Sequence, residues 1–133
     1  MKNKIVLTLG IWGFPDTAHQ EISDRLGLVP VKIFIKGEPT SPKLQILAKK
    51  NGWMYSQPNR EFDSFESQMN DLMEALRVKE SELKKLTDKY YCELSCAIFK
   101  VDEEESMPWV HLTKAHVTFM NEFSIEFDLD LYV

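Results

Sequence analysis

Apolar residues alternate with polar or small ones at both ends of the chain, the pattern of a strand that buries one face. Every second residue from Ile5 to Ile11 is apolar, which predicts a strand over residues 4–12. Every second residue from Ile125 to Val133 is also apolar, and the positions between them are mostly acidic. We therefore expect a closing strand with one buried face and one acidic, solvated face.

Between these strands, apolar residues recur every three or four positions in several places, which predicts helices. The first helix should begin at an N-cap, Asp16, and end at Gly27. The strongest helix begins at a sequence that resembles a capping box, residues 63–66, and continues to residue 76. A more polar helical segment follows to residue 90, as a second helix or as part of one broken helix. Thr113 should cap a last, short helix.

Other segments predict further strands. They cover residues 31–36, 52–57 and 91–101, with residues 109–112 as the hairpin partner of the last one. Residues 38–51 carry conflicting signals, because Ser41-Pro42 is typical of a helix start while the apolar residues that follow suit an extended segment. Both alternatives stay open.

The order of these elements is β-α-β-β-α-β followed by β-α-β, which predicts an α+β fold. The first six match a ferredoxin-like, split βαβ plait, and the last three would extend its mainly antiparallel sheet. Helices would cover one side of that sheet, giving a two-layer sandwich. With 133 residues, 44% of them hydrophobic, the chain suits a single globular domain over residues 1–133.

The net charge of −5 disfavours indiscriminate binding to nucleic acid. The charge is unevenly distributed, because residues 1–60 carry nine basic and four acidic side chains, whereas residues 61–133 carry seven and seventeen. Either the two halves neutralise each other in the fold, or the domain has a basic face and an acidic face.

The two cysteines, Cys92 and Cys96, are four residues apart in the strand predicted over residues 91–101. In an extended strand they would be about 13 Å apart, beyond the reach of a disulfide. Two reduced thiols suit a reducing cytoplasm. The apolar start of the chain lacks a signal-peptide cleavage pattern, and no segment approaches the length of a membrane span. We expect a cytoplasmic protein with no membrane partner.

No catalytic or metal-binding signature emerges from the sequence. Gly10 and Gly13 lack the other residues of a phosphate-binding loop. His19, His111 and His116 have no nucleophile beside them in sequence; we expect a solvated His19 and a hydrogen-bonded packing role for His116. We expect no cofactor and no metal ion, and whether the protein is an enzyme stays open.

An acidic row on the closing strand is the first candidate for function. Glu126, Asp128 and Asp130 would lie about 7 Å apart on one face, where they would attract a cation or a basic partner surface. Lys32 and Lys36, on the outward face of the second strand, could lie across the sheet and compensate this charge internally. These five residues are the predicted interaction face.

The second candidate is a small-ligand pocket between the sheet and the helices, lined by Trp12, Trp53, Trp109 and His111.

A third candidate, a single-strand nucleic-acid groove, would combine Trp53 and Tyr55 with nearby basic side chains. The overall acidity makes nucleic acid an unfavoured partner. The basic residues concerned are Lys36, Lys43, Lys49, Lys50 and Arg60.

Several motifs together resemble the bacterial domain-of-unknown-function family 4279. They are Leu26-Gly-Leu-Val-Pro30, Lys36-Gly-Glu38, Gly52-Trp53 and the closing residues 125–133. The similarity spans nearly the whole chain, although Phe34 stands where the family is expected to have Trp and residues 39–50 are not a close match. The resemblance implies a small cytoplasmic α+β protein, often standing alone, with no assigned activity.

The sequence thus predicts a protein of unknown function whose leading role is a non-catalytic binding or interaction domain, such as an inhibitor or immunity-type partner. It would engage a protein partner through its acidic sheet face or a sheet edge. The alternative is a small-ligand-binding protein or a small hydrolase-like enzyme with the Trp/His-lined pocket. The sequence does not predict the oligomeric state.

Overall fold

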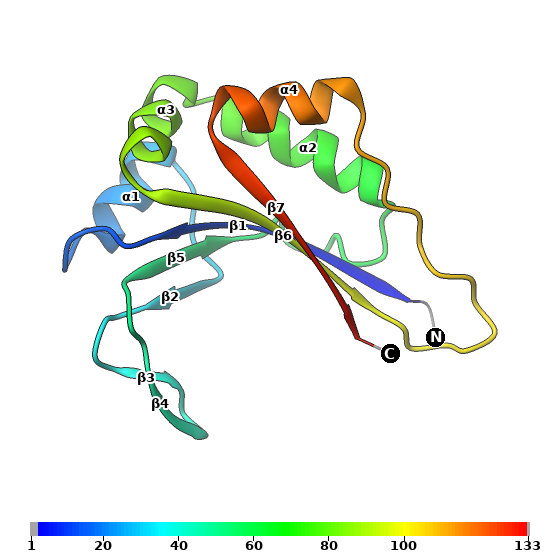
Figure 1. The fold of residues 1–133 in the computed structure, drawn as a ribbon, viewed down its shortest axis with the longest axis horizontal. Helices are drawn as coiled ribbons and strands as arrows, with labels where there is room; N and C mark the ends of the chain where they lie inside the picture. The colour runs from blue at the N-terminus through cyan, green and yellow to red at the C-terminus, as the bar shows by residue number, and fades with distance from the viewer. Residues whose placement is uncertain (1–2, 133) are drawn as a thin grey trace.

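A five-stranded sheet forms the centre of the molecule in the computed structural model, which describes residues 3–132 (Figure 1). Its strands, in spatial order, are β2 (Lys32–Phe34), β5 (Gly52–Tyr55), β1 (Lys4–Trp12), β6 (Tyr91–Phe99) and β7 (Ile125–Tyr132). Neighbouring strands are antiparallel except β6 and β7, which are parallel. The mainly antiparallel α+β sheet predicted from the sequence is confirmed.

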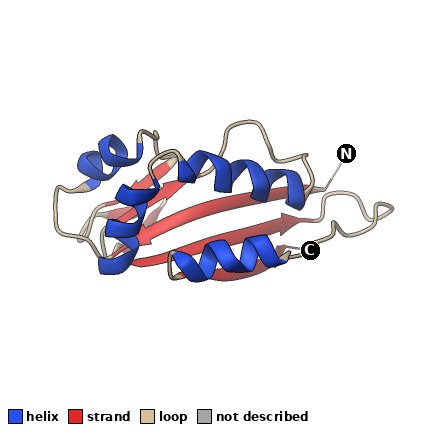
Figure 2. Ribbon diagram, turned by 90° about the horizontal axis from the view of Figure 1, so that it is seen from above, coloured by secondary structure: helices blue, strands red, loops and turns tan. Residues whose placement is uncertain are grey.

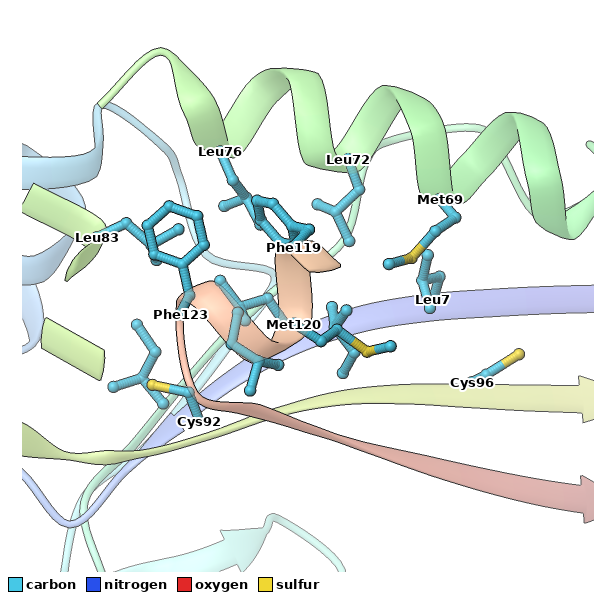
Figure 3. Packing of buried hydrophobic residues seen from close by; sticks show 14 of the residues in the cluster. Leu7, Met69, Leu72, Leu76, Leu83, Cys92, Cys96, Phe119, Met120 and Phe123 are labelled. Atoms are coloured by element: carbon cyan, nitrogen blue, oxygen red, sulfur yellow. The ribbon is translucent and has the colours of Figure 1, made fainter. Parts of the chain in front are cut away.

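Helices cover one face of this sheet (Figures 1 and 2). They are α1 (His19–Leu26), α2 (Phe65–Arg77), α3 (Glu80–Lys89) and α4 (Lys114–Glu122). The core lies between the two layers, where Leu7 of β1 and the thiols of β6 meet side chains such as Leu72 and Phe119 (Figure 3). The opposite face of the sheet carries no helix among residues 3–132, and we call it the open face.

The first helix starts later than predicted. It begins at His19, with Ala18 as an N-cap that makes no side-chain hydrogen bond. Asp16 does not cap it, because its carboxylate accepts a hydrogen bond from the Asn51 side chain at 2.7 Å. The predicted stop is confirmed, since Gly27 ends the helix in the left-handed conformation that favours glycine.

The remaining helices follow the predicted pattern with small shifts. The N-cap of α2 is Ser64, whose hydroxyl accepts from the Ser67 amide, one residue later than the capping box predicted. Helix α2 ends at its C-cap, Val78, and α3 begins after its N-cap, Lys79, so that the two are separate helices. Thr113 caps α4 as predicted, and the N3 side chain, His116, completes the capping box.

Residues 38–51 take the extended alternative. They form a hairpin of β3 (Pro39–Ser41) and β4 (Leu44–Leu47), which we call the arm. Ser41 starts no helix; its hydroxyl accepts a hydrogen bond from the Leu44 amide across the hairpin turn. The arm projects from the ends of β2 and β5 on the side of the open face (Figure 1).

The predicted strand over residues 109–112 is wrong. Both edges of β6 are occupied, by β1 on one side and by β7 on the other, so no edge is left for a hairpin partner. Residues 100–113 instead form a loop whose first part is tied to Asn3. The Asn3 side-chain oxygen accepts from the Val101 amide at 2.8 Å, and its amide group donates to the Ser106 carbonyl.

The closing strand lies at an edge of the sheet and is only partly covered. Ile125 is buried beneath the helix layer, whereas Leu131 is 57% exposed, because β7 diverges from α4 toward its C-terminal end (Figure 1). The predicted strand is formed from Ile125 to Tyr132, but the predicted burial of its apolar face holds only for Ile125 and, in part, for Phe127. Val133 lies outside the described residues.

Candidate functional site

The acidic row extends over two strands rather than one. Strand alternation turns Glu126, Asp128 and Asp130 of β7 onto the open face, where all three are exposed. The parallel register places Glu93 of β6 directly beside Glu126. We call these four residues the acidic patch.

No residue of the acidic patch forms an ion pair within residues 3–132. Glu93 instead accepts a hydrogen bond of 2.7 Å from the Tyr91 hydroxyl. This bond is the main reason why the pKa of Tyr91 is raised to about 12, with smaller contributions from burial and from the charges of Glu93, Glu126 and Asp128. The smaller contributions of the three carboxylates to the raised pKa of Tyr91 reflect the negative potential above this part of the sheet.

The two lysines of the predicted interaction face lie elsewhere. Lys32 is on β2, at the opposite edge from β7, and four strand spacings amount to about 19 Å. Its ammonium group lies 4.6 Å from the ring centre of Phe34. Lys36 follows the end of β2 and is exposed. The structure therefore does not bring these lysines to the acidic patch, and the internal compensation considered from the sequence is not formed.

Sequence analysis missed Glu93. The signal was present, because Cys92 and Leu94 are apolar neighbours in a predicted strand and Glu93 must then point the other way. Its place beside Glu126 depends on the parallel pairing of β6 with β7. The β-α-β order allows this pairing, but the sequence analysis paired β6 with residues 109–112 instead.

The structure separates the four residues of the predicted Trp/His pocket. Trp53 is fully buried in the core, where its indole N–H donates to the Ser23 hydroxyl at 2.9 Å. Trp109 is 88% exposed and shares a pocket of about 300 Å³ with His111 and Phe65. Trp12 lies on the open face, on the other side of the sheet from Trp53.

Trp12 borders a different pocket, of about 350 Å³, between the open face and the arm. Its ring lies over two glycines of adjacent strands. A methyl group built at Gly52 would come within 2.4 Å of the indole Cζ3 atom, and one built at Gly10 within 2.7 Å of the indole nitrogen. The two glycines thus leave the space that the indole ring fills, a relation that sequence analysis missed.

The predicted nucleic-acid groove loses its aromatic platform, because Trp53 is inside the core and no base can stack on it. Arg60 is not free either, since it pairs with Asp63 and Asp71.

Buried titratable groups belong to the core rather than to a site. Burial raises the pKa of Cys92 to about 12 and that of Cys96 to about 11, so both are protonated, free thiols that face the helices (Figure 3). His116 is fully buried between the Thr113 amide and the Asn70 side chain, in the predicted packing role. His19 is not simply solvated as expected, because its Nε2 atom forms a hydrogen bond of 2.8 Å with the Phe34 carbonyl oxygen.

Two kinds of feature are absent from residues 3–132. No group of three or more His, Cys, Asp or Glu side chains within residues 3–132 is placed to hold a metal ion. In the same range, no helix combines the length and the apolar character that crossing a bilayer requires.

Comparison with protein-family models gives a match over residues 3–133 to a domain of unknown function, DUF4279. The chain belongs to this family. The match covers almost the whole sequence and confirms the resemblance found in its motifs. Comparisons with curated proteins and with solved structures gave no match. Membership of DUF4279 therefore identifies the family and assigns no activity.

Proposed function

We propose that the protein is a non-catalytic binding module whose acidic patch holds the basic surface of a partner protein. The observation that carries this proposal is the set of four neighbouring carboxylates on the open face, none of which has a cationic partner within the described part of the chain. An inhibitor or immunity-type role stays a prediction of the sequence.

The electrostatics of the patch favour a partner of opposite charge. Glu93 and Glu126 are direct neighbours on adjacent strands, and like charges in such positions destabilise a sheet. Lysine or arginine side chains of a partner would relieve this repulsion and speed the encounter of the two proteins. No strand of residues 3–132 lies beside the outer edge of β7, so a partner could also add backbone hydrogen bonds there.

We also infer that β1, β2, β5 and β6 form a ferredoxin-like plait. Their spatial order, β2-β5-β1-β6, and their antiparallel pairing support this assignment. In this description the arm is inserted between the second and third strands of the plait, while α4 and β7 extend it. One continuous core supports the proposal of a single domain, and two reduced thiols support a cytoplasmic location.

The proposal is tested by partner capture from the native host followed by quantitative binding. The variant E126Q/D128N/D130N removes three charges of the patch and keeps the shapes of the side chains. E38Q/E103Q/E104Q is the matched control, because it removes three exposed carboxylates outside the patch. We expect the first variant to weaken binding of the captured partner at least tenfold and the control to leave it within about twofold.

Binding to the acidic patch must also weaken as salt is raised, because exposed charges are screened. A partner that binds both variants equally well, or whose affinity does not change with salt, would contradict the proposal.

A further inference from the structure

The pocket beside Trp12 has a floor built from aromatic rings. The indole lies over Gly10 and Gly52, and the ring of Phe34 follows at a centroid distance of 5.2 Å and an angle of 31°. Glycine is unfavourable within a strand, so a glycine on each of two adjacent strands beneath one ring marks a position where close approach matters. The two rings are in tilted contact, and both contribute apolar surface to the pocket on the open face.

The arm supplies the walls of this pocket. Ile46 and Leu47 of β4 line it together with Ala48, which follows β4, and Thr40 of β3 lines it as well. Ile46 and Leu47 are 63% and 53% exposed, so their apolar surface is open to an occupant. A volume of about 350 Å³ lies in the range of small-molecule sites.

Two lysines give the pocket a charge. Lys49 and Lys50 line it, both are exposed, and neither forms an ion pair within residues 3–132. Glu93 lies on the β6 side of the Trp12 ring, because the register pairs it with Gly10, one of the two glycines beneath that ring. An anionic group in this pocket would therefore be attracted toward Lys49 and Lys50, between the arm and β5, and repelled from Glu93 of β6.

From this arrangement we propose that the pocket is a binding site for a small molecule that combines a planar aromatic ring with a carboxylate or phosphate group. The ring stacks on Trp12 and packs against Ile46 and Leu47, and the anionic group lies toward Lys49 and Lys50. No residue of the acidic patch lines this pocket, and the lysines that line it carry the opposite charge. A failure of the proposed partner binding would therefore not contradict ligand binding at this pocket, nor would the reverse.

The test uses the three indole N–H resonances of the 15N-labelled protein. They are distinct reporters, because Trp53 is buried, Trp109 is exposed outside this pocket, and Trp12 borders it. A Trp12→Phe variant assigns the Trp12 resonance. The probes are indole-3-acetate and adenosine 5′-monophosphate, which separate an aromatic carboxylate from a nucleotide as the source of this chemistry. Indole-3-acetamide and adenosine are their uncharged counterparts.

We expect at least one anionic probe to shift the Trp12 resonance saturably and to leave those of Trp53 and Trp109 in place. The uncharged counterpart should bind about fivefold more weakly, since two exposed charge contacts contribute modestly. The variant K49Q/K50Q should lower the affinity for the anion to that of the uncharged probe. The matched variant K43Q/K114Q, whose lysines lie outside the pocket, should not change it. Trp12→Leu removes the indole reporter, so its binding is followed by the backbone amide resonances of Lys49 and Lys50. We expect the anionic probe to shift these amides in the wild type and not in Trp12→Leu, with a dispersed spectrum showing that the variant is folded.

Three results would each overturn the proposal. The first is no saturable shift of the Trp12 resonance with either anion at millimolar concentration. The second is equal affinity for the charged and uncharged probes. The third is a shift of Trp109 in place of Trp12, which would assign the ring to the pocket of Trp109 and His111.

Discussion

At the scale of single residues, Asn51 connects three parts of the chain. Its side-chain oxygen accepts from the Lys36 amide, and its side-chain amide donates to the Phe14 carbonyl and to Asp16. Its own carbonyl accepts from the Gly13 amide. Asn51 is only 3% exposed, so water cannot replace these bonds without a structural change.

Replacing Asn51 by Ala should lower the free energy of unfolding by about 1–3 kcal/mol, because it leaves buried backbone groups unpaired. Urea denaturation measures this loss. Asn121→Ala, at an exposed position in α4, is the control and should change stability by less than about 0.5 kcal/mol. Equal effects of the two substitutions would show that the side-chain bonds of Asn51 contribute nothing.

His116 should make stability depend on pH. Burial is the main reason why its pKa is lowered from 6.5 in the folded protein, against an opposing contribution from Glu66. The unfolded chain therefore binds a proton at a higher pH than the folded chain does. The stability due to neutral His116 is complete above pH 6.5 and is lost as the pH falls from there to the lowered pKa.

Denaturation curves of the wild type and of His116→Gln across this pH window measure the effect. Gln at the same position can retain the capping box, since Gln is common at N3. The wild type should lose more stability than the variant between pH 7.5 and pH 5.5, values chosen to bracket the ordinary histidine pKa of about 6.5. Parallel curves would contradict the lowered pKa.

Residue roles were predictable from the sequence where they depend on local spacing. The Thr113 cap and the Gly27 stop depend on neighbours within one helical turn. The role of Asn51 was not predictable, because the partners of its side chain come from residues up to 37 positions away. Asp16 was assigned to the wrong role for the same reason, since Asn51 engages its carboxylate.

At the scale of elements, the arm is independent of the core. Apart from Ala48, which follows β4, none of its residues is buried. Backbone bonds between Gly37 and Ala48, and between Ala48 and Glu38, close its base. The sequence left this segment undecided because its apolar residues pack against no core, so neither helical nor strand periodicity is imposed on them.

Replacing residues 39–47 by Asn-Gly should therefore preserve the fold. The dipeptide favours the two-residue turn that would join Glu38 to Ala48. We expect the free energy of unfolding to change by less than about 1 kcal/mol, as for surface changes away from the core. Loss of cooperative unfolding would contradict the independence of the arm. Binding of the aromatic anion at Trp12 should disappear with the arm, which removes Ile46 and Leu47.

Element order was the part of the fold that the sequence predicted best, and strand pairing was the part that it predicted least well. The limits of β1 and β7 follow from alternation within one strand. The partner of β6 does not follow from such a local pattern. Residues 109–112 and β7 both have apolar positions, and only one of them can pair with the edge of β6 that β1 leaves free.

At the scale of the whole molecule, the uneven charge of the sequence becomes an uneven open face. Lys49 and Lys50, which form no ion pair in the described part of the chain, line the pocket beside β4, and the carboxylates of the acidic patch lie on β6 and β7. The two halves of the chain do not neutralise each other there. The sequence therefore predicted an acidic face as one of two alternatives. It could not predict that this face lies far from Lys32, because that distance depends on the order of strands in the sheet, which composition does not specify.

Neutralising the acidic patch should stabilise the free protein. The variant E126Q/D128N/D130N should gain about 0.5–1 kcal/mol at low ionic strength, because like charges on adjacent strands repel. The gain should shrink in about 1 M salt, where the screening length falls to about 3 Å. Thermal denaturation of this variant, of E38Q/E103Q/E104Q and of the wild type measures it. A loss of stability that salt does not change would show that the carboxylates are structurally required.

The exposed edge of β7 has a consequence for aggregation. If two copies met edge to edge along β7, three carboxylates of one copy would lie close to three of the other, and their mutual repulsion opposes strand pairing between copies. Leu129 and Leu131 are exposed on the other side of the same strand. Removal of the three charges, as in E126Q/D128N/D130N, should therefore make concentrated samples fibrillar while the wild type stays clear.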